Sequence, residues 1–584
     1  MTDNARISVN LLSSQIKIFP DTAPGEYPAL LPEHGTCLSG EPFSFQIAVR
    51  TAGSSFHPIS AAVTSKLPVS VYKIGFVPLN TACNPNREKG YARSESGLYP
   101  DVLLARPAVP KIVSYPNAWG GELYCEEDTQ TTFNCTADVT QGLWVTLNED
   151  SIPFPAGDYP VHIILTSLID GTVLFETEYV VSVIGMTLPR VPAYYTNWFH
   201  CDCLADLYGV EVYSERFWEI FASFVSNAAK HRMNTLLLPA FTPPLDMPIG
   251  GTRKNVQLVG ITVGQDGVYH FDFSKMRRYL DLARACGMTY FEHCHLFSQW
   301  GAEHAPLIYA DVDGRETLIF GWDTDAAGEE YRAFLAQYLT AFASFAREIG
   351  IWEQMVFHVS DEPSAAHEEH YRAAVEGVRP YLCGCIIADA LSDYRYYERG
   401  LVSTPIASLD HVGTFAGRCD DLWVYYTGGP YMKNCSNRLI SNTAARTRVL
   451  GVQMYALGAK GFLHWGYNYY YDRMSQGLFD PFADPCAYKQ MPGSTYLVYP
   501  GRDGRAIPSI REKLMAEAFC DLGALQLLET QIGRDAVLAL CRDVLGEEIA
   551  PTTIPDDNAL TALRAAGNRA LVQHVGGALI LCYI

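Results

Sequence analysis

After about residue 190, the sequence becomes a series of short apolar stretches separated by longer amphipathic segments. This alternation is typical of parallel sheets and closed barrels, because an amphipathic helix can cover the sheet between one strand and the next. Eight stretches have the length and composition of buried strands, namely Tyr194–Phe199, Asn234–Pro239, Thr289–His295, Met355–Ser360, Cys385–Asp389, Ile406–His411, Leu422–Thr427 and Gly461–Tyr467. Helical patterns separate several of them, namely Ser214–His231, Phe273–Cys286, Glu329–Ile349, Glu368–Arg379 and Arg438–Leu457. We therefore expect a (β/α)8 barrel of the TIM type over residues 191–530, since this is the simplest closure of eight such strands.

The first 190 residues have a different pattern, in which apolar and polar residues alternate over short runs broken by turns. Alternation of period two predicts strands that are buried on one face only. The clearest runs are Phe43–Val49, Val69–Ile74, Leu143–Leu147, Tyr159–Leu165 and Glu178–Ile184. We expect an antiparallel β-sandwich over residues 1–190, followed by a stiff linker at Leu188–Pro192.

Residues 531–584 are expected to form a helical C-terminal extension. Helical patterns run from Arg534 to Leu545 and from Ala559 to Ala566, with Gly567 as the predicted stop. The chain then ends in the apolar run Ala578–Ile584. Such an end packs against the barrel or against a second subunit in a homo-oligomer, and the sequence leaves both open.

Charge and hydropathy exclude several classes of partner. The 584 residues carry a net charge of −21 without any basic run, so we expect no nucleic-acid partner. No apolar stretch approaches the roughly 18 residues of a membrane span, and the first residues lack the layout of a signal peptide. We therefore predict no membrane association and a cytoplasmic location. The sixteen cysteines include no Cys-x-x-Cys pair, and we expect them to be reduced.

Two acids, Asp361 and Glu362, directly follow the apolar stretch Met355–Ser360. Successive side chains of a strand point to opposite faces, so two acids at a strand end can reach different atoms of one ligand. Glycosidases need such a division of work, because the leaving oxygen requires a proton and the cation-like centre requires a negative partner. A structural interpretation is also open, in which the acids only favour the start of the helix that follows Pro363.

Polar and aromatic residues also follow other predicted strands. In a barrel these carboxyl ends share one rim, which is where barrel enzymes have their active sites. The segments concerned are Trp198–Asp202 after the first strand, His293–Trp300 after the third, Asp361–Glu362 after the fourth, Tyr425–Tyr426 in the seventh and His464–Asn468 in the eighth.

Three segments resemble the glycoside hydrolases of family 123, which include β-N-acetylgalactosaminidases and many uncharacterised relatives. They are Ser360–Pro363, Gly461–Asn468 and the late pair Tyr499–Gly504 and Pro508–Arg511. The order and spacing of these segments are more specific than any one of them. Members of this family also carry a β-sandwich before the barrel, so the resemblance covers roughly residues 35–530.

The resemblance implies release of a terminal β-linked N-acetylhexosamine, first of all N-acetylgalactosamine, from an oligosaccharide or a glycoconjugate fragment. In this family the 2-acetamido oxygen of the sugar attacks the anomeric carbon and forms an oxazolinium intermediate. Asp361 would then hold the acetamide, and Glu362 would act as acid and base. Around them we expect substrate-binding residues at His295, Tyr426, Trp465, Tyr467 and Asn468. No cofactor and no metal are expected.

Three alternatives stay open. The first is a glycosidase of the same fold that acts on another sugar. The second is a zinc-dependent hydrolase, because His200–Cys203 and His293–His295 would lie at strand ends and contain zinc-ligand types. The third is a carbohydrate-binding protein without catalysis. A further motif, Asp311–Gly314, resembles the start of a calcium loop, but its apolar flanks favour a hairpin turn.

Overall fold

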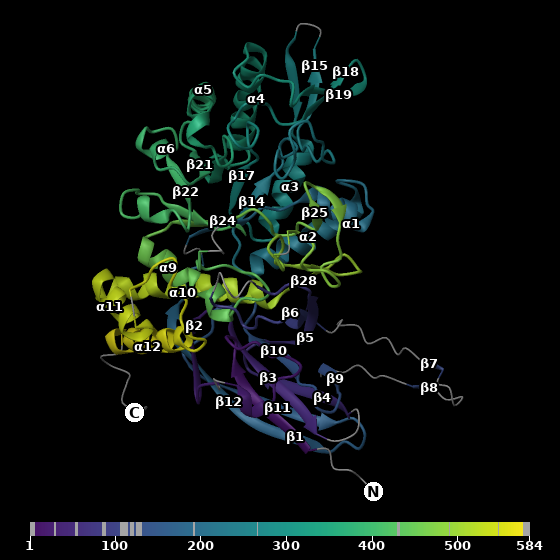
Figure 1. Ribbon diagram of the computed structural model, residues 1–584, viewed down its shortest axis with the longest axis vertical. Helices are drawn as coiled ribbons and strands as arrows, with labels where there is room; N and C mark the ends of the chain where they lie inside the picture. Colours follow the sequence, from purple (N-terminus) through teal and green to yellow (C-terminus); the bar gives the residue numbers. More distant parts are fainter. Residues whose placement is uncertain are drawn as a thin grey trace.

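The computed structural model describes residues 6–575 except 28–30, 53–56, 84–88, 106–114, 117–121, 124–130, 191–192, 265–266, 429–432, 490 and 547. Two β-sheets form the N-terminal part, a closed barrel lies above them in Figure 1, and the C-terminal helices lie beside both. Among the residues described, no helix has both the length and the apolar composition that crossing a bilayer requires.

The N-terminal part contains two five-stranded sheets, which are antiparallel except for one pair of strands, β2 and β12. The inner faces of both sheets share one apolar core. Each of the five strands predicted for this part is present. The first sheet has the order β1 (Arg6–Ser13), β3 (Phe43–Ala52), β10 (Gln141–Leu147), β5 (Val69–Leu79), β6 (Gly97–Ala105), and the second has the order β2 (His34–Ser39), β12 (Val173–Thr187), β11 (Gly157–Ser167), β4 (His57–Ser65), β9 (Thr131–Cys135). A separate short pair joins β7 (Tyr115–Pro116) and β8 (Glu122–Leu123).

Eight parallel strands close into a barrel after residue 193, and they are the eight that the sequence predicts. Their side chains are almost all buried, which explains why they appear in the sequence as continuous apolar stretches. Pairing of the first strand with the last closes the barrel. In order they are β13 (Tyr194–Asn197), β14 (Thr235–Leu238), β17 (Tyr290–His293), β20 (Met355–Phe357), β21 (Ile386–Leu391), β22 (Thr404–Ser408), β23 (Trp423–Tyr425) and β24 (Gly461–His464).

Amphipathic helices connect the barrel strands. In α2 the Ser214 hydroxyl caps the helix by accepting the N–H of Phe217, and apolar residues three and four apart face the barrel. Helix α4 buries a row of aromatic rings in the same way. The helices of this region are α1 (Cys201–Tyr208), α2 (Glu215–Lys230), α3 (Ser274–Ala285), α4 (Glu329–Glu348), α5 (Glu368–Val378), α6 (Arg395–Glu398), α8 (Ala444–Arg448) and α9 (Leu450–Leu457).

One predicted helix is wrong at its N-terminal end. The pattern Arg438–Leu457 predicts a helix from Arg438, but α8 begins at Ala444 with Thr443 as its N-cap. The guanidinium of Arg438 is fully buried and donates to Asn197 and to the carbonyl oxygen of Gly466. These acceptors lie inside the barrel rim, and the segment has to stay non-helical to reach them.

A four-stranded sheet made from two barrel loops extends over one side of the barrel, with the order β16 (Tyr269–Asp272), β15 (Gly260–Val263), β18 (Ile308–Val312), β19 (Arg315–Phe320). The motif Asp311–Gly314 forms its hairpin turn, as the flanking pattern predicts. Asp313 and Gly314 have φ of 51° and 80°, and the Gly314 N–H donates to the Asp311 carboxylate. Two short hairpins follow the barrel, β25 (Tyr471–Arg473) with β26 (Gln476–Leu478) and β27 (Tyr499–Pro500) with β28 (Ala506–Ile507).

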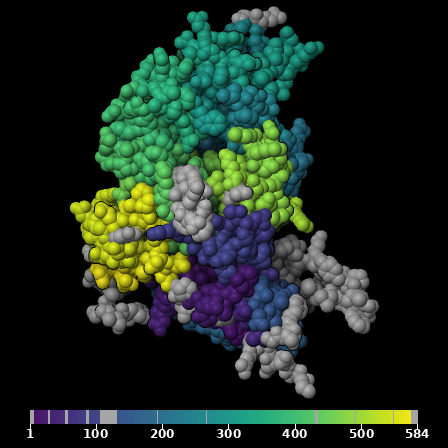
Figure 2. Space-filling model, in the orientation of Figure 1, coloured from purple at the N-terminus to yellow at the C-terminus, as the bar shows by residue number. Residues whose placement is uncertain are grey.

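The C-terminal helices α10 (Ile510–Ile532), α11 (Arg534–Leu545) and α12 (Ala559–Val575) pack on the barrel and also reach the N-terminal sheets. Figure 2 shows them in yellow against both parts. Arg564 of α12 pairs with Glu41, and Asn568 donates to the carbonyl of Thr36. These contacts hold α12 as a helix beyond Gly567, so the predicted stop at that glycine is wrong. The apolar end Ala578–Ile584 lies outside the described residues.

Candidate active site

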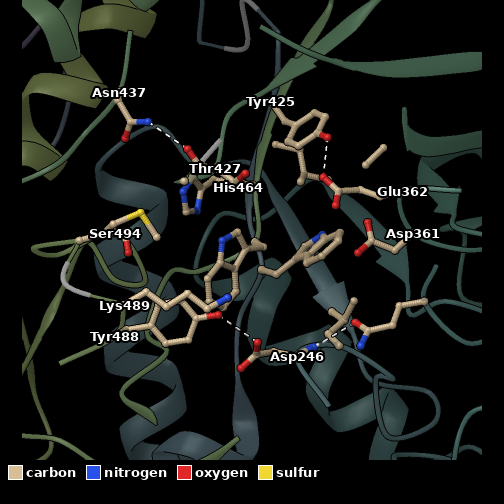
Figure 3. A pocket seen from close by; sticks show the side chains of 18 of the residues that line it. Asp246, Asp361, Glu362, Tyr425, Thr427, Asn437, His464, Tyr488, Lys489 and Ser494 are labelled. Carbon is tan, nitrogen blue, oxygen red and sulfur yellow. Dashed lines mark hydrogen bonds between the residues drawn. The ribbon is translucent and has the colours of Figure 1, made fainter. Parts of the chain in front are cut away.

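A cavity of about 450 Å³ opens at the carboxyl ends of the barrel strands. Each of the five strand ends singled out in the sequence contributes to its lining, and later loops close the remaining side. Figure 3 shows Asp361 and Glu362 on one wall and Tyr488 and Lys489 on the opposite wall. The lining comprises Trp198, Leu245, Asp246, Gln299, Trp300, Asp361, Glu362, Ala390, Tyr425, Thr427, Gly428, Asn437, Leu439, Leu463, His464, Trp465, Tyr488, Lys489, Met491 and Ser494.

Asp361 and Glu362 lie in a bend after β20, and neither belongs to a helix cap. The following 3-10 turn is capped by Ser364, and the acids of the first turn of α5 are Glu368 and Glu369. The structural interpretation of the pair, as helix-entry acids, is therefore wrong. Glu362 is exposed and has a left-handed backbone with φ of 42°. Such a conformation is strained for a residue with a side chain, and strain of this kind gathers at functional sites.

The two acids have different environments. Burial raises the pKa of the Asp361 carboxyl well above its ordinary value, the carboxylates of Glu362 and Asp389 raise it further, and His358 opposes them. The Tyr425 hydroxyl donates to Oε1 of Glu362 over 2.5 Å. Burial and the charge of Glu362 raise the pKa of Tyr425 well above its ordinary value, so its phenol stays a donor.

A buried polar network lies beneath the acid pair. His358 Nε2 is 3.1 Å from Glu292 Oε1, and His358 Nδ1 is 2.5 Å from the carbonyl oxygen of Ala388 and 3.6 Å from Asp389 Oδ1. Burial alone would lower the pKa of His358, but hydrogen bonds and charge from Asp389 and Glu292 raise it to about 10. His358 is therefore an imidazolium at neutral pH.

Asp246 is the main acceptor of the opposite wall. Its carboxylate accepts the hydroxyls of Tyr469 and Tyr488, and its backbone N–H donates to Gln299. The backbone at Asp246 is left-handed, with φ of 46°. The ammonium of Lys489 lies 4.9 Å from the ring centroid of Tyr488 on the same wall.

Of the five residues predicted to bind substrate, Trp465 lines the cavity. The other four, His295, Tyr426, Tyr467 and Asn468, are at most 1% exposed and lie behind the lining. Three of the four have polar partners within the protein: Tyr426 points to the sulfur of Met515, Tyr467 bonds Asn227 and Glu512, and Asn468 bonds the backbone of His200. The ring of His295 stacks on that of His358 at 4.9 Å.

Several lining residues were missed by the sequence reasoning. At β23 the side chain that reaches the cavity is Tyr425, because neighbouring residues of an extended segment point to opposite sides and Tyr426 faces away. Trp300 lies at the rim and is 43% exposed. The sequence could have pointed to it, because it ends the polar and aromatic segment that follows the third strand. Asp246, Tyr488 and Lys489 lie in loops that carry no periodic pattern, so no signal could have found them.

The two segments with zinc-ligand types have other roles. Asp202 pairs with the buried Arg253, His200 bonds the carbonyl of Trp465, and His293 lies next to the Tyr338 hydroxyl. Within the described part of the chain, one group of possible ligands comes together, His295 with His358 and Asp389. Both nitrogens of His358 have acceptors, so neither offers a lone pair to an ion. This arrangement does not fit a metal ion.

Comparison with known proteins gives one family. The model of the catalytic domain of glycoside hydrolase 123 matches residues 198–528. Among solved structures, a family 123 glycoside hydrolase from Clostridium perfringens, described with the hydrolysis of glycolipid glycans, is similar over 97% of both chains, with 13% identity and a TM-score of 0.68. A β-glucuronidase from Bacteroides uniformis covers 80% of this chain and 48% of its own, with 10% identity and a TM-score of 0.29, too low to bear on the fold. No curated protein sequence matches the chain.

Proposed function

The chain belongs to glycoside hydrolase family 123 and is a glycoside hydrolase, and from that premise we propose that it releases a terminal β-linked N-acetylhexosamine, first of all N-acetylgalactosamine, by substrate-assisted hydrolysis with retention. The observation that carries this proposal is the pair Asp361 and Glu362, adjacent in sequence and directed into one cavity but with different surroundings. In this proposal the closed barrel is of the TIM type, with its site at the carboxyl ends of the strands.

Asp361 acts on the acetamide. Its carboxylate accepts the acetamide N–H and turns the acetamide oxygen toward the anomeric carbon. The bond from that oxygen to the anomeric carbon forms while the glycosidic C–O bond breaks, and the ring so formed is the oxazolinium. A negative carboxylate beside the cationic ring stabilises it by charge attraction.

Glu362 moves the protons. It donates its proton to the departing glycosidic oxygen and then, as a carboxylate, accepts a proton from the water that attacks the anomeric carbon. That attack opens the oxazolinium and restores the acetamide. Because Tyr425 donates to Oε1, the second oxygen of Glu362 is left to carry the transferred proton.

The remaining wall residues bind the sugar. Trp465 offers an apolar face for stacking on a pyranose ring, and Asp246 is placed to accept sugar hydroxyls. Trp300, at the rim next to the acids, is placed to stack on the leaving part of the glycan. His295, Tyr426, Tyr467 and Asn468 support this wall from behind.

The substrate in this proposal is the glycan of a glycoconjugate or a short oligosaccharide derived from one. The similar Clostridium perfringens enzyme, described with glycolipid glycans, supports that class. All cysteines of the described segments are free thiols, which supports a reducing, cytoplasmic setting.

The test is hydrolysis of aryl β-glycosides of N-acetylgalactosamine, N-acetylglucosamine, galactose and glucose. We expect release from the N-acetyl sugars only, lost in Asp361→Asn and reduced about 100- to 10,000-fold in Glu362→Gln, in keeping with the weight of general acid catalysis. Release of galactose or glucose at comparable rates would contradict participation of the acetamide.

A further inference from the structure

We infer that His358 is a positioning residue of this enzyme, whose imidazolium favours the charged form of Asp361 and balances the charge of Asp389, which fixes the segment before both acids. The inference rests on the proposed function, in which Asp361 acts as a carboxylate. His358 is 1% exposed and is not among the residues that line the cavity, so it acts through Asp361 and not on the sugar.

His358 is held from two strands of the barrel. Glu292 on β17 lies 3.1 Å from its Nε2, and Asp389 and Ala388 on β21 meet its Nδ1. Glu292 accepts in addition the hydroxyl of Thr196 on β13, over 2.5 Å. Both ring nitrogens therefore have acceptors, which requires a proton on each of them.

The same network fixes the backbone before the acids. The Asp389 carboxylate accepts the N–H of Val359 at 3.0 Å and of Ser360 at 3.4 Å, and also the hydroxyl of Tyr371. Asp389 can hold these donors beside His358 as an anion, and the imidazolium balances its charge. The segment from His358 to Asp361 is therefore tied to β21 as well as to β20.

In the part of the chain that the structure describes, His358 is the cation that acts on Asp361. The groups that act on its carboxyl are Glu362 and Asp389, which oppose ionisation, and His358, which favours it. Tyr425 also faces the pair and is neutral. His358 itself is faced by Glu292, by Asp389 and by the stacked ring of His295, which burial keeps neutral.

The consequence of losing His358 follows from its charge. A neutral side chain at this position removes a positive charge that lowers the pKa of Asp361, so that pKa rises. Asp361 is then protonated up to a higher pH, and the acidic limb of the activity profile moves to higher pH. An opposite charge within a few ångströms typically shifts a carboxyl pKa by about 1 to 3 units.

The test measures the titration of Asp361 itself, by NMR of the side-chain carboxyl carbon in protein labelled at aspartate, assigned with Asp361→Asn. In His358→Gln we expect the midpoint of Asp361 to rise by about one pH unit or more. Tyr371→Phe is the matched control, because it removes a hydrogen bond to Asp389 and leaves the charge of His358. The titration midpoint of Asp361 in this variant should stay near that in the unaltered protein. An unchanged midpoint in His358→Gln would overturn the inference.

A second measurement uses the unaltered protein. The ring nitrogens of His358 in the unaltered protein should both show the NMR shifts of an imidazolium at pH 8, and a neutral ring at pH 7 would overturn the inference even if the His358→Gln protein does not fold. The acidic limb of kcat/KM should follow the Asp361 midpoint in both variants. Neither NMR measurement depends on turnover, so absence of any sugar release would count against the proposed function and not against the role of His358.

Discussion

At the scale of single residues, the site separates two carboxylates that are adjacent in sequence. Burial and the charges of Glu362 and Asp389 raise the pKa of Asp361 and His358 opposes them, whereas Glu362 is exposed and accepts a hydrogen bond from Tyr425. The two neighbouring acids therefore have different surroundings, which is what two different roles in one reaction require.

Tyr425 and Tyr426 offer a matched test of this arrangement. Tyr425→Phe removes the hydrogen bond to Glu362, and because bonds to charged groups are worth about 1.5–3 kcal/mol, kcat should fall about 10- to 100-fold. Tyr426→Phe removes only a weak contact with the sulfur of Met515 and should leave kcat close to the original. Equal kcat values for the two variants would contradict the role given to Tyr425.

The sequence was informative about some residues of the site and silent about others. Asp361, Glu362 and Trp465 were found because each comes at the end of an apolar strand. Tyr467 and Asn468 lie on the same strand end but face the protein interior, and a sequence does not state which way a side chain points once the strand has ended. Asp246 reaches the site through a loop whose path depends on its tertiary contacts.

At the scale of elements, close helix packing determines where side chains are tolerated. Helices α9 and α10 approach most closely at Gly451, where an added Cβ would lie 1.9 Å from the carbonyl oxygen of Ala518. This approach holds α10 against the barrel.

The eight barrel strands were predictable because each is buried on both faces and so is apolar throughout, whereas the start of α8 was not, because Arg438 takes its conformation from distant acceptors.

Gly451→Ala should therefore destabilise the protein by roughly 1–3 kcal/mol or more, since an overpacked contact with backbone has no flexible atom to yield. Gly377→Ala in α5 is the control, because the added Cβ would meet only the Arg332 side chain, at 4.0 Å, and alanine favours a helix by roughly 0.5–1 kcal/mol. Chemical denaturation of both variants checks this. A denaturation midpoint of Gly451→Ala equal to that of Gly377→Ala would show that α9 and α10 can separate freely.

At the scale of the whole molecule, buried ion pairs join the N-terminal sheets to the barrel. Asp101 on β6 and Arg511 on α10 are both fully buried and 3.0 Å apart. Arg511 also donates to the carbonyl oxygens of Gly493 and Tyr496, in the region that supplies Met491 and Ser494 to the cavity. The sheets therefore support one wall of the site although they contribute no residue to it.

Asp101→Asn leaves the Arg511 guanidinium buried without its counter-charge. Breaking a buried pair in this way typically costs about 3–5 kcal/mol, so the thermal midpoint should fall by several degrees. Glu215→Gln, which breaks the exposed pair with Arg278, is the control and should leave the midpoint unchanged. Equal midpoints for both variants would mean that the sheets and the barrel are not joined through Asp101.

In the proposed reaction the acetamide of the sugar is the nucleophile and Asp361 holds it. The most direct measurement is calorimetric binding of N-acetylgalactosamine-thiazoline, a stable analogue of the oxazolinium. We expect binding at least about 100-fold tighter than that of N-acetylgalactosamine, as is usual for analogues of a reactive state, and loss of this advantage in Asp361→Asn. Equal affinity for the two ligands in the unaltered enzyme would contradict it.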